Sequence, residues 1–252
     1  MTTHRISMPS PGSRTITGLA AILATLFAIP SLAWATTITF DDSGFVNGQI
    51  VTGVPGVAIE ANNFVLPCDD AIIFDTEQRH SRFPQLEARK YGLPRWSGGN
   101  LEGVQLNNVL VLDRCIGGRC GANFGHHRQA TGTLRFVFDV PITSIGFDMI
   151  NVTRRSAKVG SVTFTDINDV SVTITQRVLL ACLQIGHNTA NRIDPLSAEG
   201  LGLGPIKSVT FLMGGATALD NITYETVPEP ATGLFLGLGL ILLSGVRRQR
   251  AA

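Results

Sequence analysis

A period-two alternation of apolar and polar residues recurs along the second half of this chain and restricts its possible folds. In residues 133–138, Leu134, Phe136 and Phe138 share one face, with Thr133 and Arg135 on the other. The pattern returns in residues 145–149, 162–164, 172–174, 209–213 and 222–224. Such alternation predicts strands with one face buried and the other in contact with water.

Further β-rich runs occur earlier, and turn residues separate all of these segments. The runs at 37–40, 57–61, 71–75 and 108–113 are bounded by Gly, Pro, Asn or Asp, and we expect turns at 139–141 and 166–169. No segment shows an amphipathic helical pattern of ten residues or more. About ten strands at this spacing predict an all-β fold: a single antiparallel β-sandwich, of jelly-roll type.

The N-terminal residues have the pattern of a secretory signal peptide. Arg5 and Arg14 precede an apolar run at 18–34 that ends in Ala33-Trp34-Ala35, a small-x-small cleavage pattern. We expect signal peptidase to remove residues 1–35 after transport by the general secretion machinery. The alternative is a permanent N-terminal transmembrane helix, which Pro30 near the end of the run disfavours.

The C-terminal residues form a three-part pattern at 227–250. Pro228, Glu229 and Pro230 should form a short extended peptide, because proline fixes φ and disfavours helix in the preceding residue. Residues 231–246 are uncharged and apolar and predict a short transmembrane helix, about 24 Å long against about 30 Å of hydrocarbon. Arg247, Arg248 and Arg250 follow and should stay cytoplasmic.

This combination closely resembles the PEP-CTERM sorting signal of Gram-negative bacteria. In that family an exosortase-type membrane protease is understood to recognise the Pro-Glu-Pro motif and to process the protein at or near it. The resemblance implies a protein that is exported, held transiently at the inner membrane, and then delivered to the cell surface or the extracellular space. The alternative is an ordinary C-terminal membrane anchor.

The segment between the two signals, residues 36–226, is long enough for one domain and shows no composition break. From residue 36 to 227 there are 15 Lys and Arg against 18 Asp and Glu, a net charge of −3. This balance gives no basic surface for nucleic acid, so we expect no nucleic-acid partner.

All four cysteines lie in this exported segment, where disulfides can form. We favour pairing Cys115 with Cys120, which flank a flexible Ile-Gly-Gly-Arg stretch, and Cys68 with Cys182. Free cysteines are one alternative. A zinc site is another, although the spacing to His126 and His127 does not follow the usual ligand pattern.

Two polar segments, 77–96 and 114–129, interrupt the strand pattern and predict long loops. Trp96, which ends the first, is the candidate ligand-binding residue. Its ring, and that of Tyr91, could stack on a sugar while Arg95, Asn100 or His80 reach hydroxyl groups. The alternative is that Trp96 plugs one end of the sandwich.

No catalytic residues can be assigned from the sequence. Cys182, His187 and Asn188 lie close together but match no nucleophile signature, and the apolar run 178–183 predicts a buried cysteine with a raised pKa.

The ends of the domain also resemble those of carbohydrate-binding modules with a galactose-binding-like jelly roll. The residues concerned are Phe40-Asp41-Asp42 and Leu219-Asp220-Asn221. In those modules an acidic residue near each end of the domain often holds a structural Ca²⁺. The resemblance implies ligands at Asp42 and Asp220, with Asp41 as a substitute and Asp148 as a weaker candidate; the alternative is that these aspartates bind no metal.

We therefore expect a non-enzymatic surface or matrix protein that is structural or glycan-binding in exopolysaccharide. The alternative is a secreted polysaccharide hydrolase.

Overall fold

The computed structural model describes residues 35–41, 44–64, 69–78, 86–87, 96, 98–112, 131–215 and 217–227. Their strands and helices are, in order, β1 (Ala35–Ile38), β2 (Gly53–Val54), β3 (Val57–Asn63), β4 (Ala71–Asp75), β5 (Asn108–Leu112), β6 (Thr131–Ile150), α2 (Arg154–Val159), β7 (Ser161–Asp166), β8 (Ser171–Thr175), α3 (Gln176–Leu179), β9 (Ala190–Ser197), the 3₁₀ turn η2 (Glu199–Leu201), β10 (Ile206–Gly214) and β11 (Ala218–Thr226). All strand pairs are antiparallel. The longest described helix has six residues, in line with the predicted all-β class.

No described helix combines the length and the hydropathy that a membrane crossing requires. The predicted span at 231–246 and residues 1–34 of the predicted signal peptide 1–35 lie outside the described residues, whereas Ala35 is the first residue of β1. Residues Ala33–Val227 form one compact unit.

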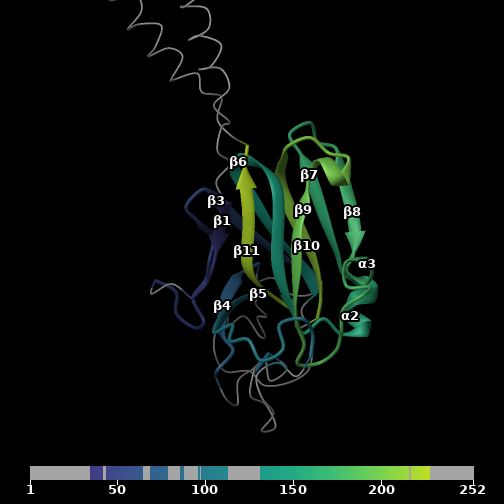
Figure 1. Ribbon diagram of the computed structural model, residues 1–252. Helices are drawn as coiled ribbons and strands as arrows, with labels where there is room; N and C mark the ends of the chain where they lie inside the picture. Colours follow the sequence, from purple (N-terminus) through teal and green to yellow (C-terminus); the bar gives the residue numbers. More distant parts are fainter. Residues whose placement is uncertain are drawn as a thin grey trace, which may run out of the picture. The chain divides into compact units, whose positions relative to one another are not determined.

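Strand β6 is the centre of the fold, with twenty residues that belong to two layers (Figure 1). Its first half pairs with β3 and β10, and β7 and β8 continue that layer, which we name the β8 layer. Its second half pairs with β9 and β11, and β1, β5 and β4 continue the β11 layer. The hydrogen-bonded sheet is therefore continuous, and it curls so that its two layers face each other across the core.

The predicted turn at 139–141 is wrong, because β6 runs through it without a break. Pro141 lacks an N–H, but it lies where the strand passes from one layer to the other. There the backbone bonds to neighbouring segments, since Asp139 N donates to Gly56 O and Val227 N donates to Pro141 O, both at 2.9 Å. Proline is tolerated at such an irregularity because no ladder hydrogen bond is lost.

Aromatic contacts between the layers build the core. The Phe211 ring of β10 lies 4.8 Å from the Phe147 ring on the second half of β6, with the two planes nearly perpendicular. Phe138 and Tyr224 also meet across the layers at 5.1 Å. Edge-to-face pairs of this kind add about 0.5–1.5 kcal/mol beyond the burial of their area. The predicted β-sandwich is confirmed, and the alternating residues of the sequence face its core.

A second apolar cluster covers the opposite face of the β11 layer. Val109 and Val111 of β5 belong to this cluster, whereas Leu110 and Leu112 face the main core. The segment between β4 and β5 supplies Leu86, Trp96, Leu101 and Leu106 to it. Leu86 and Trp96, which belong to the predicted loop 77–96, therefore cover this face of the sheet.

Strand β9 is not predicted by the sequence pattern. Its residues Asn191, Arg192, Asp194 and Pro195 break the apolar alternation, yet it pairs with β6 from Ala190 to Ser197. The strand exists because β6 offers an open edge, which tertiary pairing fills despite poor local propensity.

Candidate functional site

Three charged residues stand in register across the β11 layer. Arg192 of β9 is opposite Asp148 of β6, and Asp148 is opposite Asp220 of β11. Phe147 and Leu219, which precede the two aspartates, face the main core. Because side chains alternate along a strand, the aspartates point to the other face of this layer.

Arg192 and Asp148 form a bidentate ion pair. Arg192 Nε donates to Asp148 Oδ1 at 2.8 Å and Nη2 donates to Oδ2 at 2.9 Å. The aspartate side chain is fully buried, whereas half of the arginine side chain stays exposed. The hydrogen bond to Asp148 raises the pKa of Arg192, although burial opposes the rise. Parallel, charge-assisted bonds of this kind fix orientation as well as charge.

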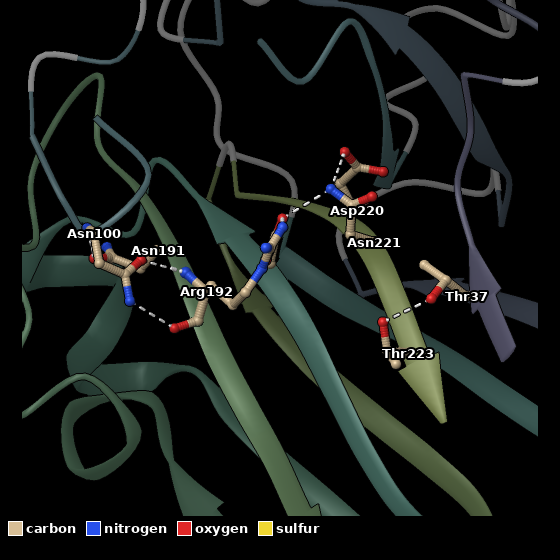
Figure 2. A network of polar contacts seen from close by, with 8 residues as sticks. Thr37, Asn100, Asn191, Arg192, Asp220, Asn221 and Thr223 are labelled. Carbon is tan, nitrogen blue, oxygen red and sulfur yellow. Dashed lines mark hydrogen bonds and ion pairs between the residues drawn. The ribbon is translucent and has the colours of Figure 1, made fainter. Parts of the chain in front are cut away.

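Asn221 joins the two aspartates. Its Nδ2 donates to Asp148 Oδ2 at 2.8 Å and to Asp220 Oδ2 at 3.0 Å (Figure 2). Asn221 has a φ of 47°, and the pairing of β11 with β6 shifts register between Asp220 and Thr223. Asparagine tolerates this left-handed conformation better than most residues. The irregularity brings the amide of Asn221 to the same polar network as the neighbouring Asp220.

Asp220 is the least satisfied member of the network. It is 1% exposed, and its Oδ1 has no hydrogen-bond partner. Burial and, to a smaller extent, the nearby charges of Asp41 and Asp148 raise the pKa of this carboxyl to about 8, although hydrogen bonds from the backbone amides of Asn221 and Phe40 oppose the rise. The site therefore favours a proton or another cation at Asp220.

Asp41 connects the end of β1 to the start of β5. Its Oδ1 accepts a bond from Asn108 N at 2.9 Å, and its Oδ2 accepts one from Asn107 Nδ2 at 3.2 Å. Asn108 Nδ2 in turn donates to Phe40 O at 3.0 Å. Asp41 thus acts as a clasp between two segments that are 67 residues apart.

The carboxylate oxygens at this site fit the predicted Ca²⁺ only in part. Both carboxylate oxygens of Asp41 and of Asp148 already accept protein hydrogen bonds, which leaves Asp220 Oδ1 open. The predicted partner Asp42 lies outside the described residues. In the part of the chain that the structure describes, no three His, Cys, Asp or Glu side chains are grouped to hold a metal. Because Ca²⁺ takes six to eight oxygen ligands, the fit depends on what Asp42 and its neighbours add.

Trp96 does not present its ring to solvent. It is fully buried in the second apolar cluster, beside Leu86, Leu101 and Leu106. A sugar cannot stack on a ring whose faces are covered, so stacking on Trp96 is not available in this structure. The burial agrees with the alternative that Trp96 is a plug. His80, Tyr91 and Arg95 lie outside the described residues.

Asn100 fixes the Trp96 segment to the edge of β9. Its Nδ2 donates to Arg192 O at 2.9 Å, and its Oδ1 accepts from Arg192 N at 2.6 Å (Figure 2). One side-chain amide thereby replaces a neighbouring strand at this position. The preceding Gly99 has a φ of +94°, and a Cβ there would lie 2.1 Å from Ala190 O. Only glycine allows this close approach.

Cys182 is exposed, so the prediction that it is buried is wrong. The run 178–183 comprises the last two residues of α3 and the turns after it, in which Leu180 is buried and Val178 is 65% exposed. Cys68, Cys115 and Cys120 lie outside the described residues. The two disulfide pairings therefore stay predictions.

Two signals in the sequence could have revealed the polar network. Asp148 interrupts the apolar run from Ile145 to Ile150, and the pair Asp220–Asn221 interrupts the last strand. A charged residue in a buried strand requires a partner. The identity of the partner, Arg192, was hidden because β9 itself was not predicted.

The fold and its C-terminal extension define a class of protein: an exported β-sandwich that carries a sorting tail. Residues 226–249 match the family described as the PEP-CTERM protein-sorting motif, which confirms the prediction made from Pro228, Glu229 and Pro230. This motif implies export to the cell envelope with sorting at the membrane, and processing by an exosortase. The sorting residues themselves lie outside the described region, whose last residue is Val227.

Other comparisons add less. No curated protein matches the chain. Among solved structures it is similar to the K2 cleaved adhesin domain of Lys-gingipain, at 12% sequence identity and a TM-score of 0.39. That similarity covers 75% of this chain and 97% of the other.

Proposed function

We propose that this protein is a non-enzymatic component of the surface or extracellular matrix of a Gram-negative bacterium, delivered there by its C-terminal tail. The observation that carries the proposal is the sorting motif at residues 226–249, which follows the β-sandwich directly. The described polar groups of the network are engaged largely with one another, which suits a structural role. A polysaccharide hydrolase is the competing hypothesis.

The contact with exopolysaccharide is assigned to the outer face of the β8 layer. Thr163 stands in register between Thr210 and Thr173, and the row continues through Arg135 and Glu60. The charges of Arg135 and Glu60 form an ion pair at 2.9 Å. The hydroxyl residues on this face, which we name the hydroxyl face, include Thr133, Ser161, Thr163, Thr165, Ser171, Thr173, Thr175 and Thr210.

The chemistry of the hydroxyl face suits an uncharged glycan chain. Each hydroxyl both donates and accepts hydrogen bonds, as Thr163 and Thr173 do with each other at 2.8 Å. The paired charges leave the face close to neutral. Wet polar contacts of this kind are individually weak, so binding would rely on many repeats of the same glycan.

Retention on the host's own exopolysaccharide tests this assignment. The exported protein should be retarded on a column of that polysaccharide, and Thr163→Val with Thr210→Val should weaken the retardation while leaving the fold intact. Thr37→Val, on β1 of the other layer, is the matched control and should change nothing. Release of reducing ends from the polysaccharide would instead support the hydrolase hypothesis. Equal retention of all variants would exclude the hydroxyl face as the binding surface.

A structural Ca²⁺ near Asp220 also belongs to the proposal. The open Oδ1 of Asp220 supports it, together with the surplus of three carboxylates over one arginine in the network. Ca²⁺ would offset the buried charge and link the two ends of the domain. A chelator should lower the melting temperature and added Ca²⁺ should restore it, whereas Asp220→Asn should remove the response. An unchanged melting temperature in the wild type would contradict the site.

Processing at the tail has its own test. Glu229→Ala should make the uncleaved precursor accumulate in the membrane fraction. Glu225→Ala, four residues upstream and inside β11, is the control and should be processed normally. Normal processing of both variants would contradict recognition of the Pro-Glu-Pro motif.

A further inference from the structure

Strand β8 is an edge strand of the sheet (Figure 1). Among the described residues it pairs with β7 on one side, and no strand pairs with its other side. Val170 O accepts from Asp166 N, and Gln176 N donates to Gly160 O, so the even-numbered residues bond towards β7. Because an antiparallel ladder alternates, Ser171, Thr173 and Thr175 direct their N–H and C=O groups to the open side. All three are exposed.

The other long edges of the sheet are protected. Gly98 O and Leu101 N bond to the backbone of Ala190 in β9 at 3.1 Å each, and Asn100 holds Arg192. Pro195 then removes a donor from the rest of that edge. On β4, Gln49 O accepts from Ile73 N at 2.9 Å. On the outer side of β3, β2 pairs with Val57 and Ala58, Ile59 N donates to Thr52 O at 2.8 Å, and Asn63 N donates to Asp69 Oδ1 at 2.7 Å. The edge strands β1 and β2 have only four and two residues.

Strand β8 carries none of these protective features. Its sequence, Ser-Val-Thr-Ile-Thr, has no charge and no proline, and its pairing with β7 shows no register shift. Natural sheets usually guard such an edge, because it is a template for pairing with another strand. An unguarded edge in one place, beside guarded edges elsewhere, indicates that a partner is accommodated there.

We propose that the partner is a second copy of this chain, whose β8 pairs antiparallel with β8 about a two-fold axis at Thr173. In this register Thr173 faces Thr173, Ser171 faces Thr175, and Val172 faces Ile174. All three outward residues gain backbone hydrogen bonds. A two-fold contact uses up both edges, so it gives a closed dimer and not a fibre.

The register is self-complementary in side chains as well as in backbone. Hydroxyl residues meet hydroxyl residues on one face, as in the existing pairs Thr163–Thr173 at 2.8 Å and Thr165–Ser171 at 2.9 Å. Val172 and Ile174, which are half-buried at the margin of the main core, gain apolar cover on the other face. The flanking charges are opposite, because Asp169 precedes the strand and exposed Arg177 follows it. Asp169 pairs with Lys207 at 2.6 Å, but its side chain is 84% exposed and so stays accessible to a second cation. An antiparallel second copy brings unlike charges together at both ends.

Cysteine substitutions test this register in the full chain, exported into an oxidising compartment. Facing residues at hydrogen-bonded positions have Cα atoms about 5.5 Å apart, within the range of a disulfide. Thr173→Cys should therefore give a dimer linked by a disulfide between the two substituted positions, identified by mass spectrometry of the linked peptides. Ser171→Cys and Thr175→Cys should not link to themselves, since like positions lie about 13 Å apart along the strand. They should link to each other when the two variants are co-expressed.

The opposite pattern would overturn the proposal. Absence of the self-link of Thr173→Cys in folded protein would do so, as would self-linking of Ser171→Cys at the same yield. If Thr173→Cys fails to accumulate, the mixed pair of Ser171→Cys and Thr175→Cys decides the register. The wild-type chain is the reference for links through native cysteines, including exposed Cys182.

A proline variant gives a second readout that needs no cysteine. Thr173→Pro removes an outward N–H and leaves the bonds to β7 in place, so it should convert the dimer to a monomer in sedimentation velocity. Thr173→Val keeps the N–H and should remain dimeric. A wild-type protein that stays monomeric at every concentration, or a dimer that Thr173→Pro leaves unchanged, would contradict the pairing of β8.

Discussion

Arg192 holds the buried carboxylate of Asp148 with two parallel hydrogen bonds of 2.8 and 2.9 Å, from the neighbouring strand of the sheet. The pair lies beside Asp220, which is buried, has one oxygen without a hydrogen-bond partner, and has a pKa raised to about 8. The stability of the domain, its response to pH and the proposed binding of Ca²⁺ therefore involve the same group.

Removal of the arginine should be strongly destabilising. Arg192→Ala leaves Asp148 buried without its cation, and breaking one side of a buried pair costs about 3–5 kcal/mol. Urea unfolding of the exported protein measures this loss. Arg135→Ala, which breaks the exposed pair with Glu60, is the matched control and should cost at most about 1 kcal/mol. Equal losses of unfolding free energy in both variants would show that the Arg192–Asp148 pair stabilises the domain no more than an exposed ion pair does.

The stability of the domain should fall as the pH rises towards 8. The pKa of Asp220 is raised from 3.8 to about 8 in the folded state, so between these values the folded state holds a proton that the unfolded state has lost. Stability from this group is complete below the unfolded pKa and is lost as the pH passes through the folded pKa. The difference in unfolding free energy between the wild type and Asp220→Asn, measured with a chelator from pH 4 to pH 9, isolates it. A difference that does not change with pH would contradict the protonated state.

The two hydrogen bonds between the Asn100 side chain and the backbone of Arg192 should slow hydrogen exchange locally. Asn100→Ala removes the acceptor of Arg192 N and the donor to Arg192 O, which should cost about 1–3 kcal/mol. Exchange at the amide of Arg192 should then accelerate more than exchange at the centre of β10. Asn62→Ala, at an exposed position on β3, is the control and should leave both rates unchanged.

The fluorescence of Trp96 should depend on whether its segment is folded and should not respond to a glycan. Trp34 lies in the predicted signal peptide, so the processed chain keeps Trp96 as its one tryptophan. Its emission should be blue-shifted in the native state and should not change on addition of polysaccharide. Trp96→Ala should destabilise by about 3–5 kcal/mol, whereas Trp96→Phe should cost less. A solvent-exposed emission spectrum in the native state would contradict the burial.

Much of the sandwich was predictable because its strands alternate strictly. Leu134, Phe136, Val209 and Phe211 occupy the core as their period-two spacing requires. The sequence misled at Pro141, because a proline that would end most strands lies where β6 changes layer. It was uninformative for β9, whose polar residues are set by the open edge of β6 and not by local propensity.

The candidate site was predictable only in part. Asp220 and Asp148 were named from the resemblance at the ends of the domain, and the structure places them together. Arg192 was not named, and Asn221 was named in the terminal motif without a role. Their contacts with Asp148 depend on register between strands whose residues are 44 and 73 positions apart in the chain. Trp96 was misjudged as a binding residue, since exposure of a loop tryptophan cannot be read from its neighbours in the sequence.

We propose that the N-terminal signal peptide and the C-terminal sorting signal of this chain are both removed, which releases one β-sandwich domain. The intact mass of the protein recovered from the host's envelope or medium tests this most directly. We expect a chain that begins at Thr36 and ends at or near Pro228, Glu229 and Pro230. A mature protein that still carried Arg247, Arg248 and Arg250 would contradict it.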